Sequence, residues 1–164
     1  MAETVTAGDI VIRRAPADFT EWESIRALIL DAFAYMEHRI DPPSSALRMT
    51  AQSMAADAAA GTLLLAESDG SLVGCSFTRR KEDALYIAKL AVRPDWQGRG
   101  IGRALVAAAR DEARAQSLAA LELQTRIELR ENHAAFARMG FVKIAETAHP
   151  GFVRSTSITM RAPV

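Results

Sequence analysis

The sequence predicts a single α/β domain built on one mixed, mostly antiparallel sheet of about seven strands, with helices on both faces. Strand-like and helix-like stretches alternate in the order β-α-α-β-β-β-α-β-α-β-β, which is typical of such a sheet. The 164 residues, 49% hydrophobic and 24% charged, match the size and composition of one globular domain. The chain shows neither an internal repeat nor a low-complexity linker, so residues 1–164 are expected to form one domain.

The amino-terminal part is expected to hold a strand and then a helix. Residues 1–8 are expected to be frayed, and Ile10–Ile12 to form a short strand. Asp18 with Glu21 three residues later has the pattern of a capping box, which starts a helix. The buried face of this helix is indicated by apolar residues at helical spacing: Trp22, Ile25, Ile29 and Phe33.

A second helix is expected after Pro42 and Pro43, which end any helix before them. Ser44 or Ser45 can cap this second helix, and Gly61 lies where it stops. Its apolar face is expected to consist of Leu47, Met54 and Ala58.

The middle of the chain has the pattern of strands. Leu63–Ala66 and Leu72–Thr78 flank Asp69 and Gly70, a dipeptide favoured in tight hairpin turns, so the two stretches are expected to pair. Leu85–Val92 is a nearly continuous apolar run, which predicts a central strand covered on both faces.

The carboxyl-terminal part is expected to continue with helices and strands. A helix up to about Gln116 is predicted by the spacing of Ile101, Leu105, Ala109 and Ala113. The remaining expected elements are a strand at 121–124, a helix at about 131–138 that stops at Gly140, and strands at 141–146 and 155–161.

Composition excludes several classes of protein. The 20 basic and 20 acidic residues cancel, so the chain lacks the basic excess of a general nucleic-acid binder. No apolar run reaches the ~20 residues that cross a bilayer, which argues against a membrane role. The single cysteine, Cys75, is expected to be an inert buried thiol, and a cytoplasmic location is the default. The three histidines lack metal-ligand spacing, so no metal is expected.

A glycine-rich turn between the central strand and the following helix is the strongest functional signal. Gly98, Gly100 and Gly102 let backbone N–H groups converge at the start of the helix, where the helix dipole favours an anion. A phosphate or pyrophosphate is the natural ligand of such a turn, and Arg99 and Arg103 can add charge beside it. The alternative is a strand-to-helix turn without a ligand.

Two other phosphate-binding motifs fit less well. The Gly-Lys-Ser/Thr of a P-loop is absent. A dinucleotide fingerprint would need a glycine where Arg103 stands, although Glu122 lies about twenty residues further on, as that fold requires. Glu122 alternates inside its strand, so a dinucleotide-dependent oxidoreductase is the least favoured alternative.

The segment Gln97-x-x-Gly100-x-Gly102 resembles the acyl-CoA pyrophosphate signature of the GNAT superfamily of N-acyltransferases. The flanking Leu90-Ala91-Val92-x-Pro94 and Gly140-Phe141 resemble the family too, and the order of elements fits its fold from about Ile10 to Arg161. The tail after His149 looks like bacterial members without an assigned substrate. The resemblance implies an N-acetyltransferase that uses acetyl-CoA as cosubstrate and acts on a primary amine of a small molecule or peptide.

The resemblance also implies the residues that bind acetyl-CoA. Backbone N–H groups of residues 97–103 would hold the pyrophosphate, the backbone of β-strand residues 90–92 would pair with the pantetheine arm, and the N–H near Ala91 or Val92 would polarise the acyl carbonyl. The implied cofactor-binding residues are Leu90, Ala91, Val92, Gln97, Gly98, Arg99, Gly100, Ile101, Gly102, Arg103, Asn132 and Phe136.

The sequence departs from the family at two proton carriers. Phe136 occupies the position of a tyrosine that serves many members as the acid, and Tyr86 occupies the position of a glutamate base. Tyr86, His133 and His149 are the candidate catalytic residues in their place, because a phenol or an imidazole can carry a proton. The alternative for each of the three side chains is a purely structural role, without part in proton transfer. Because the tyrosine acid and the strand glutamate are both missing, a non-catalytic acyl-CoA-binding module stays the alternative.

The acceptor site is expected at the connection between the first two helices, as the resemblance implies. There, Glu37 and Asp41 can pair with a cationic amine, and Arg39 can hold a carboxylate, unless all three are simply solvated. The resemblance also allows a homodimer, although no residue pattern identifies a partner surface.

Overall fold

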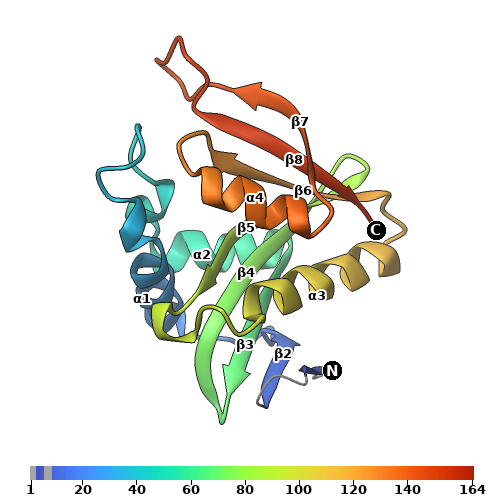
Figure 1. Cartoon of the computed structure of the whole chain (residues 1–164). Helices are drawn as coiled ribbons and strands as arrows, with labels where there is room; N and C mark the ends of the chain where they lie inside the picture. The colour runs from blue at the N-terminus through green and yellow to red at the C-terminus, as the bar shows by residue number, and fades with distance from the viewer. Residues whose placement is uncertain (1–2, 6–8) are drawn as a thin grey trace.

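A computed structural model describes residues 3–5 and 9–164 and shows one eight-stranded sheet with helices on both faces (Figure 1). The strands are β1 Glu3–Val5, β2 Ile10–Arg14, β3 Thr62–Ser68, β4 Ser71–Lys81, β5 Ala84–Val92, β6 Ala120–Arg126, β7 Val142–Thr147 and β8 Ser157–Pro163. The α-helices are α1 Trp22–Phe33, α2 Ala51–Ala60, α3 Ile101–Ala115 and α4 Arg130–Arg138. Short 3-10 helices are η1 Ala34–Met36, η2 Ser45–Arg48 and η3 Pro94–Trp96.

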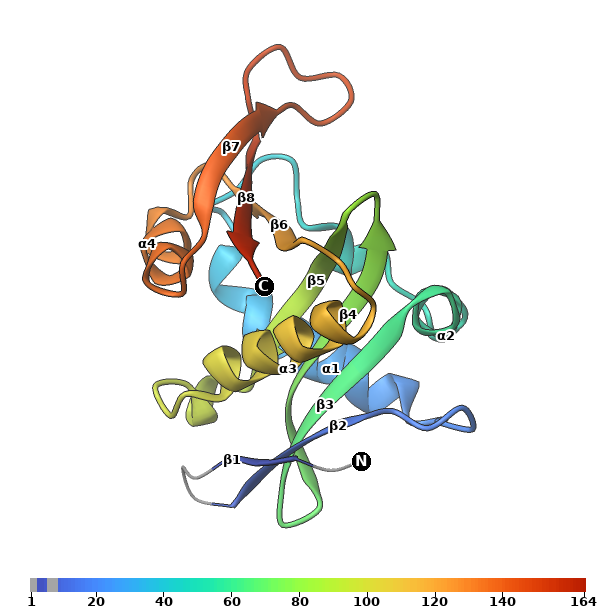
Figure 2. The same cartoon turned by 90° about the vertical axis from the view of Figure 1, so that its right-hand side faces the viewer.

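The sheet is mixed and mostly antiparallel, as predicted. Its strand order is β1-β2-β3-β4-β5-β6-β8-β7, and every neighbouring pair is antiparallel except β5 and β6. The parallel pairing of β5 with β6 covers only four residue pairs, from Ala84↔Ala120 to Ile87↔Leu123. Beyond those pairs the two strands separate, so the sheet is forked (Figure 2).

Alternating residues of the central strands pack on opposite faces of the sheet. Leu64 and Ala66 join the cluster beneath α3, whereas Leu63 and Leu65 join the cluster beneath α1 and α2. This period of two is the reason why a strand buried on both faces reads as a continuous apolar run. Phe136 of α4 packs against the cluster of α3, so α3 and α4 cover the same face.

The predicted hairpin and the predicted helix ends are confirmed in several places. Asp69 and Gly70 both have positive φ, 49° and 77°, as a two-residue turn with a right-handed strand twist requires. Gly61 follows α2, and Gly140 with φ 97° follows α4.

Three local predictions were wrong. Glu21 precedes α1 without a side-chain capping bond, so Asp18 and Glu21 form no capping box among the described residues. Ser44 caps the short η2, and a separate box of Thr50 and Ser53 starts α2, because the chain is extended at Met49 between them. Leu47 therefore lies on η2 and is 61% exposed instead of facing the core.

The amino terminus holds a strand that the sequence did not indicate. Within the stretch expected to be frayed, Glu3–Val5 pair with Ile10–Ile12 as β1. The remainder of that expectation concerns residues 1–2 and 6–8, which lie outside the described residues. Among the described helices, none is both long and apolar enough to span a membrane.

Replacing Leu105 with alanine is expected to lower the free energy of unfolding by about 2–5 kcal/mol, because this fully buried side chain would leave a cavity under α3. Leu47→Ala is the matched control and is expected to change it by less than about 0.5 kcal/mol, since Leu47 is exposed. Urea titration of both variants measures the difference. A cost at Leu47 similar to that at Leu105 would contradict the assignment of Leu47 to the surface.

Candidate functional site

The fork between β5 and β6 opens into a cavity of about 820 Å³. Residues 86–92 of β5 form one wall and residues 123–126 of β6 the other. The start of α3, one side of α4, residues within 32–36 and 44–45, and His149 and Ser157 complete the lining. Because β5 and β6 pair only as far as Ile87 and Leu123, no strand of the described chain lies between their facing edges beyond that point. The cavity can therefore accept an extended chain in the manner of an added strand.

A bulge in β5 shapes this wall. Cys75 lies opposite Ala91 and Phe77 opposite Ala88, so Lys89 and Leu90 together face the single residue Ser76. Lys89 adopts φ 53°, which turns the backbone sharply inside the strand. The bulge falls where β5 has already left β6, so it redirects backbone groups beside the cavity.

The glycine-rich turn lies at the start of α3 and lines the same cavity. Gly98 and Gly100 have φ 79° and 81°, and a Cβ added at either would meet no heavy atom of the described chain within 4 Å. No side chain in the described part of the chain caps the first turn of α3. The N–H groups of this turn are thus exposed beside open space, which is the arrangement that binds an anion.

The structure brings most of the expected cofactor-binding residues to one place. Those that line the cavity are Leu90, Ala91, Val92, Gln97, Gly98, Gly100, Ile101, Gly102, Arg103, Asn132 and Phe136. Arg99 lies outside the lining, and its guanidinium is 4.4 Å from the centre of the Trp96 ring. Gln97 donates from its side chain to the Val92 carbonyl oxygen at 3.2 Å, which fastens the turn to the end of β5.

Glu122 has a structural position that does not suit a ribose hydroxyl. Its side chain is buried, accepts a bond from Lys81 Nζ at 2.9 Å and lies 3.8 Å from Arg161 Nη1. The mixed antiparallel sheet also lacks the parallel halves of a dinucleotide fold. The oxidoreductase alternative is therefore not favoured.

His149 is the one predicted catalytic histidine that lines the cavity. Its Nδ1 is hydrogen-bonded to Thr156 Oγ1, which also donates to the Thr147 carbonyl oxygen at 3.4 Å. Because the Thr156 hydroxyl donates its proton to the Thr147 carbonyl oxygen, its Oγ1 accepts a bond from Nδ1–H of His149. Nε2 of the ring then carries the lone pair. Partial burial and the charges of Arg126 and Arg48 lower the pKa of His149, against the opposing effect of Glu128.

The other two candidate catalytic residues differ from each other in position. His133 bonds through Nε2 to the Arg126 carbonyl oxygen at 2.9 Å and lies outside the cavity lining, so it fixes the connection between β6 and α4. Tyr86 lines the cavity at the base of the fork, with Arg79 4.6 Å and Lys81 5.3 Å from its ring centre. Burial raises the pKa of Tyr86, although both cations oppose that effect, so its hydroxyl stays protonated.

A second phenol in the cavity escaped the sequence reasoning. Tyr35 of η1 lines the cavity, and its hydroxyl accepts a bond from Asn132 Nδ2 at 3.0 Å. Asn132 and Phe136 lie one turn apart on α4, and Phe136 itself packs edge-on against Phe141 at 5.7 Å. Tyr35 therefore delivers a hydroxyl from another element to the face of α4 where position 136 lacks one. The sequence signal was a tyrosine in the expected acceptor segment.

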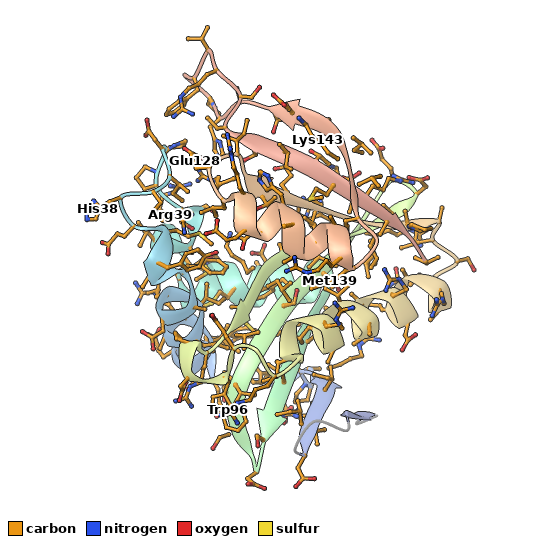
Figure 3. The ribbon with its side chains drawn as sticks, viewed as in Figure 1. His38, Arg39, Trp96, Glu128, Met139 and Lys143 are labelled. Atoms are coloured by element: carbon orange, nitrogen blue, oxygen red, sulfur yellow. The ribbon has the colours of Figure 1, made fainter. Side chains whose placement is uncertain are left out.

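The three expected acceptor residues lie outside the cavity lining. Arg39 pairs with Glu131 at 2.8 Å, and Asp41 pairs with Arg154 at 3.4 Å, while Glu37 is exposed. The Asp41 N–H also donates to Glu128 Oε2 at 3.2 Å. Figure 3 shows Arg39 and Glu128 on neighbouring segments that are far apart in the sequence. These contacts connect the loop 37–45 to the start of α4 and to the β7–β8 connection, and the role of the three residues at the acceptor stays a prediction.

Two cations that the sequence analysis did not single out line the cavity instead. Lys89 Nζ donates to Ser45 Oγ at 2.8 Å. Arg126 donates through Nη1 to the Pro42 carbonyl oxygen at 2.6 Å and through Nη2 to that of Pro43 at 3.1 Å. Burial lowers the pKa of both groups. The available signal for Lys89 was a charge inside an otherwise apolar strand.

Cys75 is fully buried, and burial raises its pKa to about 12, so the prediction of an inert thiol is confirmed. Within residues 3–5 and 9–164, no group of three or more His, Cys, Asp or Glu side chains is arranged to hold a metal ion.

Comparisons with known proteins fit this geometry. A model of the acetyltransferase (GNAT) family matches residues 22–141. The chain is 33% identical over 141 residues to aminoglycoside N(6')-acetyltransferase type 1 of Stenotrophomonas maltophilia, covering 79% of this chain and 84% of that relative.

Solved structures show the same fold. One is the PaiA N-acetyltransferase of Thermoplasma acidophilum in complex with coenzyme A, with a TM-score of 0.76 at 12% identity, covering 95% of this chain and 99% of that one. Another is an IAA acetyltransferase of Bacillus cereus, with a TM-score of 0.68 at 21% identity, covering 95% and 100%.

The pKa of His149 is expected to lie below the ordinary histidine value of 6.5, as measured by NMR titration of its ring. Arg48→Gln is expected to raise that pKa, because it removes a nearby positive charge from an exposed position. Arg114→Gln, which removes a surface charge paired with Asp111, is the control and should leave it unchanged. A His149 pKa above 6.5 in the wild-type protein would contradict this account.

Proposed function

Because this chain belongs to the acetyltransferase (GNAT) family, we propose that the cavity between β5 and β6 is the place where it transfers an acetyl group from acetyl-CoA to an amine nitrogen. The protein is an acyl-CoA-dependent N-acetyltransferase. The observation that carries the assignment of the site is the open glycine turn at the mouth of the fork, where backbone donors border a cavity.

Residues on three elements fit acetyl-CoA. The backbone of Gln97–Arg103 would bind the pyrophosphate, with the Arg103 side chain adding a positive charge. The free edge of β5 at Leu90–Val92 would pair with the pantetheine arm, and the N–H of Ala91 or Val92 beside the bulge would bind the acyl oxygen. Asn132 and Phe136 would contact the same ligand from α4. Acetyl-CoA supplies the acetyl group and a thiolate leaving group.

His149 would accept the proton that the acceptor amine must lose. An alkyl ammonium has a pKa near ~10 and is mostly charged at neutral pH, so a base is required. Nε2 of His149 offers a lone pair in the cavity, and its lowered pKa keeps the imidazole neutral. The hydroxyl of Thr156 would orient the ring by holding Nδ1–H.

Tyr35 would hold the proton for the thiolate. Its hydroxyl accepts from Asn132, which leaves its own O–H free to donate into the cavity. This arrangement would compensate for the phenylalanine at position 136. Tyr86, which also stays protonated, would act as a second hydroxyl at the base of the fork. A non-catalytic acyl-CoA-binding module would not need a neutral imidazole and two phenols around one cavity.

The acceptor is an amine of a small molecule or peptide. The relative from Stenotrophomonas maltophilia is named for an aminoglycoside, so an aminoglycoside belongs in any first set of acceptors. The cavity, about 820 Å³, has room for a small acceptor beside the acetylated end of the cosubstrate.

Gly100→Val is expected to weaken acetyl-CoA binding at least about tenfold, because a β-branched residue disfavours φ 81° and its side chain would fill the anion cradle. Gly70→Val is the matched control: its φ is 77° and its surroundings are also open, but it lies in the β3–β4 turn. Calorimetry with acetyl-CoA compares the two. Equal affinities in both variants would remove the glycine turn from the cosubstrate site.

Tyr35→Phe is expected to lower kcat by about 10- to 100-fold while leaving the KM for acetyl-CoA nearly unchanged, because it removes a proton donor and keeps the ring. Steady-state kinetics with release of free CoA as the readout measures both constants. Tyr86→Phe serves as the comparison and should have the smaller effect. The reverse order would assign the acid to Tyr86.

A further inference from the structure

Two cations from the two arms of the fork meet at one short loop. Lys89 on β5 donates to the Ser45 hydroxyl, and Arg126 on β6 donates to the carbonyl oxygens of Pro42 and Pro43. Both side chains are half-buried and both line the cavity. We call Ser44, Ser45, Lys89 and Arg126 the basic wall, because all four line the cavity around this loop.

The basic wall has more donors than its protein partners use. An ammonium has three N–H donors and a guanidinium five. Lys89 gives one bond to Ser45, and Arg126 gives two to the proline carbonyl oxygens. Both cations therefore keep donors for a ligand, and the Ser45 hydroxyl, which accepts from Lys89, can donate its own proton.

Most of the acids near the basic wall do not line the cavity. Asp57 and Glu128 act electrostatically on Lys89 and on Arg126, but neither lines the cavity. Asp41 is paired with Arg154. Glu131 is the one carboxylate among the described lining residues, and it is paired with Arg39 at 2.8 Å. The positive charge facing the cavity is thus not neutralised by a lining carboxylate of its own.

The phosphates of acetyl-CoA do not account for the basic wall. Arg103 on α3 and Arg138 on α4 line the cavity beside the glycine turn, whereas Lys89 and Arg126 contact the loop after η1. The wall also adjoins His149, whose pKa is lowered by Arg126. Lys89 and Arg126 thus line the same cavity as the proposed base, into which the acceptor amine must also come.

We infer that the acceptor of this enzyme carries an anionic group, a carboxylate or a phosphate, close to its reactive amine, and that Lys89 and Arg126 bind this group. The inference rests on the proposed function for the cavity and names the acceptor class. A bidentate or bridging anion would use the free donors of both cations. A polycationic acceptor would instead meet like charges at this wall, so an aminoglycoside is expected to be a poor acceptor here.

Matched amines test the acceptor class. Lysine is compared with cadaverine, which lacks only the carboxylate, and O-phosphoethanolamine with ethanolamine; kanamycin represents the polycations. We expect kcat/KM for lysine to exceed that for cadaverine, or kcat/KM for O-phosphoethanolamine to exceed that for ethanolamine, by about 10-fold or more. The lysine arm and the phosphate arm distinguish the two anions. A preference for cadaverine, ethanolamine or kanamycin would overturn the inference.

Substitutions test the two residues. Lys89→Gln is expected to raise the KM for the anionic amine about 10-fold or more, with the KM for acetyl-CoA unchanged, and Lys89→Arg is expected to restore most of the loss. Arg126→Gln should act in the same direction. Arg114→Gln, on the outer side of α3, is the charge-matched control and should change neither KM. An equal loss for anionic and non-anionic amines would show a merely structural role.

A binding measurement separates this inference from the proposed function. The enzyme is saturated with CoA, which occupies the glycine turn, and titrated with inorganic phosphate by calorimetry. Phosphate is expected to bind to the wild type and to bind at least about 10-fold more weakly to Lys89→Gln. Phosphate binding without acetylation of any amine would refute the proposed function and keep the anion site. Phosphate affinity that is absent, or unchanged in Lys89→Gln, would refute the anion site.

Discussion

The short parallel contact between β5 and β6 is the constraint on which the rest of this site depends. Four residue pairs hold the two halves of the sheet together, and the strands then separate. A longer contact would satisfy the facing backbone groups and close the cavity. The fork therefore leaves backbone groups beside a cavity without a strand partner, and side chains, water or a ligand must bond them instead. Gln97 bonds the Val92 carbonyl oxygen in this way, and His133 bonds that of Arg126. The bulge at Lys89 and the glycine turn line this same opening.

The electrostatics of the cavity change from one end to the other. At the start of α3, backbone donors and Arg103 favour an anion, as a CoA pyrophosphate requires. At the other end, Lys89 and Arg126 add positive charge. Burial, together with the charges of Arg126 and Arg48, lowers the pKa of His149 there. Positive surroundings also disfavour an ammonium relative to a free amine. A cationic wall thus helps deprotonate the nucleophile, and an anionic group on the acceptor would hold that nucleophile in place.

Sequence reasoning succeeded where the signal is local. The continuous apolar runs at 63–66 and 85–92 indicate burial on both faces of a strand, and Asp69 with Gly70 indicates a turn, because neighbours in the chain decide both. The glycine turn was found for the same reason. Leu47 was misplaced because Met49 is extended and divides one expected helix into two elements.

The acceptor side could not be predicted in this way, because distant segments build it. Arg39 and Asp41 were predicted to bind the acceptor, and their neighbours in the chain give no sign that the fold pairs them with Glu131 and Arg154. Tyr35 gains its role only through Asn132, 97 positions away. Lys89 was not singled out in the sequence, and the structure places it with Leu90 in the bulge of β5.

The fork has a mechanical consequence. Only four residue pairs join the two halves of the sheet, so this contact would be the hinge of any rotation of one half against the other. A slight rotation there is magnified toward the ends of the arms, at Val92 on one side and Arg126 on the other. The loop 42–45 spans these arms, held by Lys89 on one strand and by Arg126 on the other. The loop therefore connects the two strands across the cavity. Its bonds to Lys89 and Arg126 would limit how far the strands separate when a product leaves.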